Sequence, residues 1–124
     1  QLGFSLRYEP TTVSYLKLRY TFFDDYFADF DPISLGGENG GRDSWQIPSY
    51  DLIDLHCGYN FKLNQKNKLS LRLSILNLLD KIYISDALNN DPYNDVSYQD
   101  FDAKSASVFF GLGRRFTMSA RLNF

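Results

Sequence analysis

The sequence Ser105-Ala-Ser-Val-Phe-Phe-Gly-Leu-Gly-Arg-Arg-Phe-Thr-Met-Ser-Ala-Arg-Leu-Asn-Phe124 decides the fold class. Apolar and polar residues alternate along it, which is the period of a β-strand with two unlike faces. The apolar face holds Val108, Phe110, Leu112, Phe116, Met118, Ala120, Leu122 and Phe124. The polar face holds Ser107, Arg115, Thr117, Ser119, Arg121 and Asn123. We therefore expect one long two-faced strand over 105–124.

Composition supports an all-β chain without a membrane-spanning helix. The 124 residues suffice for one ordinary domain, and eleven Phe and nine Tyr favour pleated surfaces. No stretch of 18 apolar residues occurs, which argues against a transmembrane helix. The single cysteine, Cys57, excludes an internal disulfide. Gln1 already opens a strand-like alternation, so we expect these residues to be part of a longer precursor or a larger protein.

Four further segments alternate in the same way. We expect strands over Gln1–Glu9, Val13–Phe23, Tyr50–Phe61 and Lys68–Leu76, with a turn at Pro10–Thr12 and a bulge at Leu76–Asp80. The expected apolar faces hold Leu2, Phe4, Leu6, Tyr8, Leu16, Leu18, Tyr20, Phe22, Ile53, Leu55, Cys57, Tyr59, Phe61, Leu69, Leu71, Leu73 and Ile75. The prediction is an antiparallel meander of about five strands forming one unit over 1–124.

The connections between these strands alternate between short and long. Short turns lie near residues 10–12 and 62–67, and long connections span about 24–49 and 80–104. Short turns at one end and long loops at the other are typical of an outer-membrane β-barrel, whose strands turn an apolar face to lipid and a polar face to the lumen. Aromatics near the strand ends fit interfacial girdles. A soluble β-sandwich is the alternative, since it also alternates.

Charge is segregated along the chain. Asp24–Pro48 and Asp80–Lys104 contain twelve of the fifteen acidic residues and only three of the thirteen basic ones. The strands are therefore basic, although the net charge is −2. Because the basic residues are not gathered in one segment, the sequence does not predict nucleic-acid binding.

Three motifs resemble one family. Residues 45–61, WQIPSYDLIDLHCGYNF, look like the third-from-last strand of TonB-dependent outer-membrane receptors, and Asn77, Leu78, Asp80 and Tyr83 match their recurrent N-L-x-D-x-x-Y segment. Gly113–Phe116, followed by a strand ending in Phe124, resembles their closing strand. Residues 22–32 also look like a loop entry of some members.

The resemblance implies a fold, a location and partners. It implies that this chain is the closing portion of a 22-stranded transmembrane β-barrel in the cell outer membrane of a Gram-negative bacterium, with long loops extracellular and the C-terminus periplasmic. The implied partners are the plug and the other barrel strands of the same receptor, TonB through an N-terminal region absent here, outer-membrane lipid and the barrel-assembly machinery. The final strand departs from the family's assembly signal in having Ser119 where Gly is common, while Phe116, Leu122 and Phe124 fit it.

The implied function is transport, without catalysis or a cofactor. Family members import scarce nutrients such as ferric siderophores, cobalamin, haem, glycans or peptides, and this segment does not choose among them. An outer-membrane or surface β-protein for binding or adhesion is the alternative. A plug with a TonB box upstream of Gln1 would favour the transporter. A signal peptide directly upstream of Gln1 would favour the binding or adhesion protein.

Polar residues of the strands are expected to face the lumen. This set comprises Lys17, Arg19, Asp54, His56, Arg72 and Arg121, with Arg7 on the same parity. The basic members contact the plug or steer an anionic substrate, and both readings stay open. His56 is interpreted as a wall residue because no Ser-His-Asp spacing accompanies it. Cys57 falls on the apolar row, where a thiol behaves as a small hydrophobe.

The loops carry the candidate ligand sites. Aromatic residues there form an extracellular ligand platform or merely pack the loops: Trp45, Tyr93, Tyr98 and Phe101. Carboxylates are clustered at Asp24, Asp25, Asp29 and Asp31, and again at Asp91, Asp95, Asp100 and Asp102. Hard cations such as Ca²⁺ favour several oxygen ligands, but the spacing is not that of an EF-hand, and solvated loop faces are the other interpretation.

Overall fold

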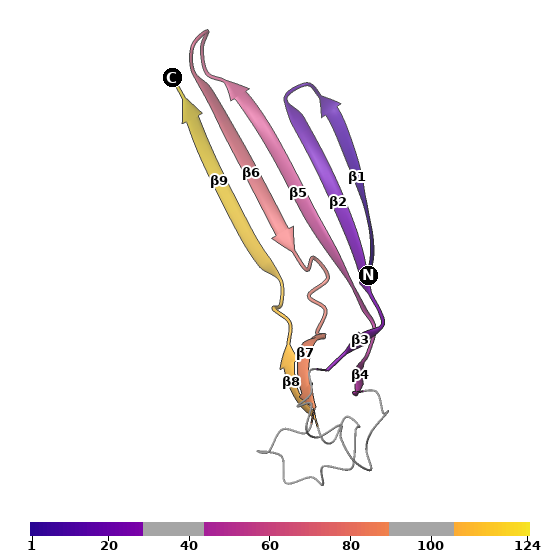
Figure 1. Cartoon of the computed structure of the whole chain (residues 1–124). Helices are drawn as coiled ribbons and strands as arrows, with labels where there is room; N and C mark the ends of the chain where they lie inside the picture. The colour runs from indigo at the N-terminus through magenta and orange to yellow at the C-terminus, as the bar shows by residue number, and fades with distance from the viewer. Residues whose placement is uncertain (29–43, 90–105) are drawn as a thin grey trace, which may run out of the picture. The chain divides into compact units, whose positions relative to one another are not determined.

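The computed structural model describes residues 1–28, 44–89 and 106–124, and within these residues the protein is all-β with no helix (Figure 1). The described residues form nine strands in three separate sheets. Their bounds are β1 Leu2–Thr11, β2 Ser14–Phe23, β3 Tyr26–Phe27, β4 Gln46–Ile47, β5 Tyr50–Lys62, β6 Lys68–Leu76, β7 Ile84–Asn89, β8 Ala106–Phe110 and β9 Arg115–Asn123. The all-β class predicted from the sequence is confirmed.

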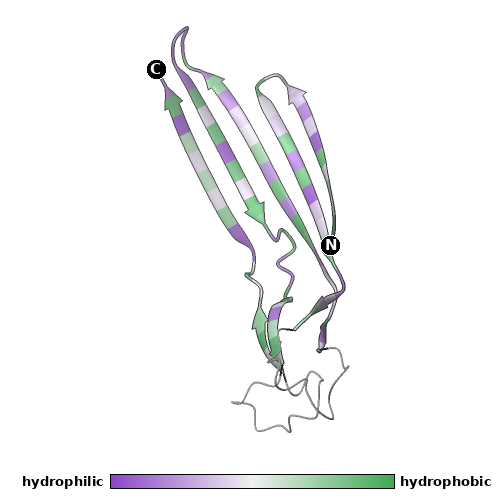
Figure 2. Cartoon of the chain, viewed as in Figure 1, coloured by the Kyte–Doolittle hydropathy of each residue, from purple (hydrophilic) through white to green (hydrophobic). Residues whose placement is uncertain are grey.

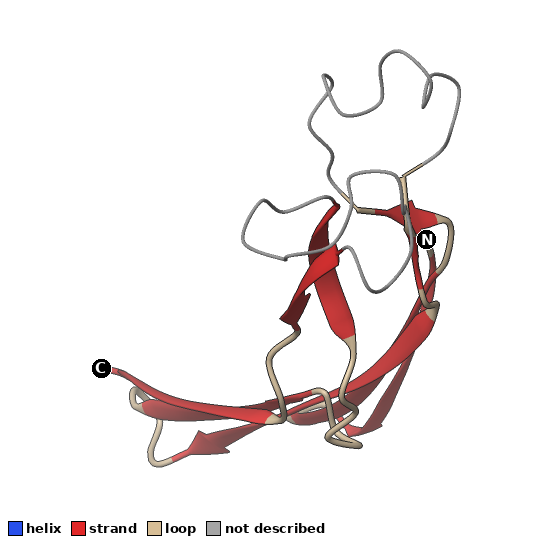
Figure 3. Ribbon diagram, turned by 90° about the horizontal axis from the view of Figure 1, so that it is seen from below, coloured by secondary structure: helices blue, strands red, loops and turns tan. Residues whose placement is uncertain are grey.

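The five long strands form one sheet in the order β1-β2-β5-β6-β9, which is the order of the chain. The arrows of neighbouring strands alternate in direction in Figure 1, and β1–β2, β5–β6 and β6–β9 pair antiparallel. The predicted five-stranded antiparallel meander is therefore confirmed. Figure 3 shows that this sheet curves rather than lying flat, as twisted strands require.

The pairing register aligns the apolar rows across the sheet. Cys57, Leu73 and Met118 stand opposite one another on β5, β6 and β9. One residue further along, Gly58, Arg72 and Ser119 form the next, polar row. On β1 and β2 the same alternation continues, with Leu6 opposite Leu18. Figure 2 shows hydrophobic and hydrophilic residues alternating along the long strands. Because successive side chains point to opposite faces, one face is apolar across several strands and the other is polar.

The predicted end of the first strand is wrong. The turn is not at Pro10–Thr12, because β1 continues through Pro10 to Thr11 and the chain reverses at Thr12 and Val13. The register shifts between Tyr8 and Thr11, so Pro10 lies at an irregularity of the strand. β1 is at the edge of this sheet, where the missing N–H of proline removes no necessary ladder bond.

The single strand expected over 105–124 is also wrong, because the chain leaves strand geometry at Gly111–Arg114. β8 pairs with β7 in a small sheet of its own, whereas β9 pairs with β6 along its whole length. The N–H of Gly111 donates to the carbonyl of Tyr83 (2.8 Å), and this bond fixes the break. The alternation of β9 is therefore predicted correctly, while its continuity with β8 is not.

The chain divides into two compact units. One contains 1–22, 51–81 and 112–124, and the other contains 23–50 and 82–111. The second unit includes two small sheets that the sequence did not reveal, β3–β4 and β7–β8. Its buried core consists of Ala28, Ile47 and Ala87, against which Trp45, Ile84 and Val108 pack. Two-residue strands such as β3 and β4 are too short to show an alternation that a sequence reading could detect.

Candidate functional site

The most distinctive functional feature is the apolar face of the five-stranded sheet, which is exposed. Leu6 is 67% exposed, Phe116 is 66% exposed and Met118 is 73% exposed. Large apolar side chains scattered singly on a surface are ordinary, but these stand in aligned rows. Within the described residues nothing covers this face, so it fits surroundings less polar than water.

The predicted assembly residues lie on this same apolar face. Phe116 pairs with Ile75, and Leu122 pairs with Leu69. Phe124 follows the last residue of β9 and is 90% exposed. The structure thus places Phe116 and Leu122 on the predicted face, while their role in assembly remains a prediction.

A shallow apolar groove of about 380 Å³ runs along the middle of this face. Cys57, Tyr59, Leu71, Leu73 and Met118 contribute the apolar lining. Cys57 is a free thiol within this row, as its parity predicted. The groove presents an almost purely hydrocarbon surface, which is suited to acyl chains or other apolar groups.

The opposite, polar face carries several cations that have no carboxylate partner among the described residues. Arg7 stands opposite Lys17, and Arg72 lies between Gly58 and Ser119 in register. Among the residues described, only Arg7 of the cations predicted to face the lumen has a carboxylate partner, Glu9 at 2.6 Å. The other four cations of this set have no ion pair with any described residue: Lys17, Arg19, Arg72 and Arg121. The face is therefore electropositive, as charge-lined passages for anions are.

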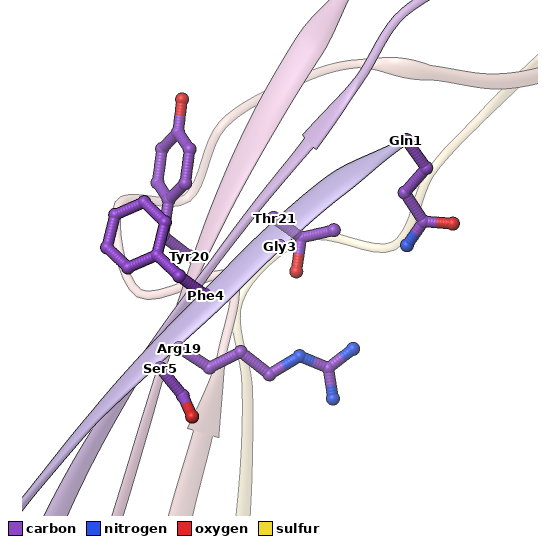
Figure 4. A pocket seen from close by; sticks show the side chains of 7 residues that line it. All are labelled: Gln1, Gly3, Phe4, Ser5, Arg19, Tyr20 and Thr21. Carbon is purple, nitrogen blue, oxygen red and sulfur yellow. The ribbon is translucent and has the colours of Figure 1, made fainter.

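An open hollow of about 320 Å³ lies along β1 and β2 and is lined by residues of both faces (Figure 4). Gln1, Ser5, Arg19 and Thr21 project to one side of the two strands, while Phe4 and Tyr20 project to the other. The two aromatic rings contact each other at 5.1 Å between centroids. This view shows the separation of polar and apolar side chains within a single strand pair.

The histidine lies on the polar face and contacts a serine. The Nδ1 atom of His56 is 2.9 Å from Oγ of Ser74, its cross-strand neighbour. The carboxylate of Asp54, two residues earlier on β5, instead accepts the N–H of Asn77 at 3.0 Å. The three side chains therefore do not form the Ser-His-Asp arrangement in which a carboxylate orients the imidazole.

A polar junction forms where β6 ends, and it replaces the bulge predicted at Leu76–Asp80. Asn77 is only 4% exposed and adopts a positive φ of 51°. Its Nδ2 donates to the carbonyls of Lys81 (2.9 Å) and Leu112 (3.3 Å), and its Oδ1 accepts the N–H of Lys81 (2.9 Å). Asparagine tolerates the left-handed region better than other non-glycine residues. The buried side-chain amide thus joins the end of β6 to Lys81 and to the segment leading into β9, while the backbone N–H of Asn77 donates to Asp54 on β5.

Asp80 extends this junction. Asp80 also has a positive φ, 54°, and its Oδ1 accepts the N–H of Arg114 at 2.8 Å. Arg114 and Asp80 form an ion pair at 3.9 Å, and Lys81 forms another with Asp51. The residues that matched the N-L-x-D segment therefore act structurally here, by fastening the return of the chain to β9.

A glycine in the middle of β5 accommodates an aromatic ring. A Cβ atom at Gly58 would come within 2.3 Å of Cε1 of Tyr15. The guanidinium of Arg7 lies over the same ring at 4.5 Å from its centroid. Sequence reasoning missed this contact, although a glycine inside an otherwise regular strand is the sign of a close approach.

Aromatic stacking occurs in the second unit. Tyr50 stacks on Phe23 at 4.6 Å and on Tyr83 at 4.4 Å between centroids. A Cβ atom at Gly111 would overlap Tyr83 at 2.0 Å, so glycine is required there. All three stacked residues are half-buried.

The predicted ligand and metal residues are only partly visible. Trp45 is half-buried against the core of the second unit, which favours packing over a free platform. Tyr93, Tyr98 and Phe101 lie outside the described residues. Asp25 accepts a hydrogen bond from Gln46 at 3.2 Å, and Asp24 is exposed. The described part of the chain contains no cluster of three or more His, Cys, Asp or Glu residues able to hold a metal ion.

The other carboxylates suggested for Ca²⁺ lie outside the described residues: Asp29, Asp31, Asp91, Asp95, Asp100 and Asp102. Over 1–28, 44–89 and 106–124, no helix is both long and apolar enough to span a membrane. No protein-family model, curated protein or solved structure matches this chain.

Proposed function

We propose that this chain is the closing part of the transmembrane β-barrel of a TonB-dependent outer-membrane receptor that imports a scarce nutrient. The observation that carries the proposal is the exposed apolar face, whose rows align from β5 through β6 to β9. Exposing such a face to water would cost free energy, roughly 25 cal/mol for each Å² of apolar surface. Lipid removes that cost, and it is the partner that a large curved apolar wall fits best.

The open edges of the sheet support the same proposal. β1 and β9 each lack a neighbour on one side among the described strands. In hydrocarbon, each unpaired backbone N–H or C=O costs several kcal/mol, so spanning sheets close upon themselves. Five strands are too few for closure, and the proposal therefore requires the remaining strands of the receptor.

The polar face supports transport as the role. It would line the lumen, with Lys17, Arg19, Arg72 and Arg121 facing the plug or the substrate. The short turns after β1 and β5 would lie on the periplasmic side, and the long connections outside the cell. Import would be energised by TonB through the N-terminal part of the receptor, and no catalytic step is required.

The test of this proposal is the location and partners of the intact protein. Membranes of the source cells should be separated by density, and the protein should be followed with an antibody against this segment. We expect the protein to be recovered with lipopolysaccharide and the full-length protein to co-purify with TonB. Recovery in the soluble periplasm would overturn the barrel, and outer-membrane recovery without TonB dependence of uptake would favour a binding or adhesion protein.

A further inference from the structure

The hairpin that joins β5 to β6 brings two positive charges directly opposite each other. Lys62 and Lys68 are cross-strand partners, the last pair before the turn. Like charges in this position are destabilising unless something compensates them. Lys66, within the turn, adds a third exposed cation.

No protein carboxylate relieves this repulsion in the described structure. Residues 55–79 contain no Asp or Glu at all. None of the ion pairs found among the described residues involves Lys62, Lys66 or Lys68. The hairpin therefore holds three cations without a counter-charge of its own.

A hollow of about 550 Å³ opens between the two opposed lysines, lined by Lys62, Asn64, Gln65 and Lys68. The Oδ1 atom of Asn64 accepts the N–H groups of Lys66 (3.0 Å) and Asn67 (2.7 Å). With its oxygen engaged within the turn, the Nδ2 group of Asn64 is left to donate outward. The lining thus combines two ammonium groups with amide donors, which is a set suited to a multi-oxygen anion.

We propose that this hollow is a binding site for a phosphate group, held by Lys62 and Lys68 with Asn64 and Gln65 as further donors. Phosphate supplies several acceptor oxygens and the negative charge that the lysine pair lacks. Two sources share this chemistry, the headgroup of an anionic phospholipid and free inorganic phosphate. The inference uses only the local geometry of the hairpin and does not depend on the proposed transport role.

The experiment measures binding to the full-length protein purified in detergent micelles. Inorganic phosphate is titrated calorimetrically, and phosphatidylglycerol is titrated by native mass spectrometry with phosphatidylcholine as comparison. The double variant Lys62→Gln/Lys68→Gln should weaken binding of the active probe by about tenfold or more, since two charge-assisted donors are lost. Saturable binding of inorganic phosphate but not of phosphatidylglycerol would identify the free ion as the ligand. Saturable binding of phosphatidylglycerol but not of inorganic phosphate would identify the lipid headgroup.

Two control variants make the result specific. Arg115→Gln removes an exposed cation at the start of β9, opposite Leu76 at the far end of β6 from the hairpin, and should leave binding within about threefold of wild type. Lys62→Arg/Lys68→Arg retains both charges and should retain binding. Circular dichroism confirms that each variant keeps the β-sheet content of the wild type. Saturable binding of neither probe, or equal weakening by both charge-removing variants, would overturn the site.

Discussion

The ring of Tyr15 lies so close to Gly58 that a Cβ atom at Gly58 would approach Cε1 of the ring to 2.3 Å. Tyr15 is on β2 and Gly58 on β5, so the contact crosses a strand pair on the polar face. The N–H of Asn60 also donates to the carbonyl of Val13 at 2.8 Å. These contacts fasten the N-terminal hairpin to the rest of the sheet.

Gly58→Ala should destabilise the protein by about 1–3 kcal/mol, because the ring must move and lose its contact with Arg7. The measurement is the urea midpoint of the intact protein in detergent. Gly3→Ala is the matched control, since its Cβ would meet nothing nearer than 3.5 Å. Equal shifts for the two variants would show that the Tyr15 ring does not depend on Gly58.

Asn77→Ala should cost about 2–4 kcal/mol, from lost side-chain hydrogen bonds and a left-handed φ that alanine disfavours. Asn77→Gly should cost less, because glycine restores the backbone freedom but not the bonds. Thermal unfolding of the intact protein measures both.

Asn67→Ala serves as the control for this pair, since Asn67 lies in the exposed hairpin turn and its side chain has no hydrogen bond in the described structure. It should change stability by less than about 0.5 kcal/mol. If Asn77→Ala changed stability as little as Asn67→Ala, the junction at the end of β6 would contribute nothing to stability.

Met118→Arg should destabilise the membrane-inserted protein by about 2–4 kcal/mol if the residue lies near the midplane of the bilayer. Thr117→Arg, one residue away on the polar face and opposite Ser74, should cost much less. Reversible folding into vesicles in urea provides the measurement. Similar costs at the two positions would argue against a lipid-facing apolar row.

Phe124→Asp should reduce the amount of folded protein in the outer membrane while leaving the ligand affinity of the folded fraction unchanged. The reason is the proposed role of Phe116, Leu122 and Phe124 in recognition by the assembly machinery. Heat-modifiable mobility of membrane fractions measures the yield. Leu63→Asp, at an exposed position of the β5–β6 turn, is the control and should assemble normally.

The face of each long strand could be read from the sequence because alternation in β1, β2, β5, β6 and β9 is nearly unbroken. Register pairs such as Leu71 with Tyr59 and Ala120 join residues of the same predicted face. What alternation could not reveal was where strands stop. Gly111 and Asn77 end strands through hydrogen bonds to residues distant in sequence, and such bonds leave no periodic trace.

The candidate sites were less predictable for a related reason. Periodicity assigned Arg72 and Arg121 to the polar face, but the absence of carboxylate partners within the described residues is a property of the assembled sheet. The opposition of Lys62 and Lys68 likewise depends on the hairpin register. A one-residue shift of that register would have separated the two charges and moved them to different neighbours.

The central claim is that the apolar face meets lipid, and spin-label accessibility along β6 tests it most directly. Single cysteines at positions 69–75 of the full-length protein, in a Cys57→Ser background, are labelled and reconstituted in vesicles. We predict high accessibility to oxygen at 69, 71, 73 and 75 and low accessibility at 70, 72 and 74, with the opposite pattern for a water-soluble nickel reagent. Apolar positions shielded from both reagents would indicate a protein-covered core and would contradict the proposal.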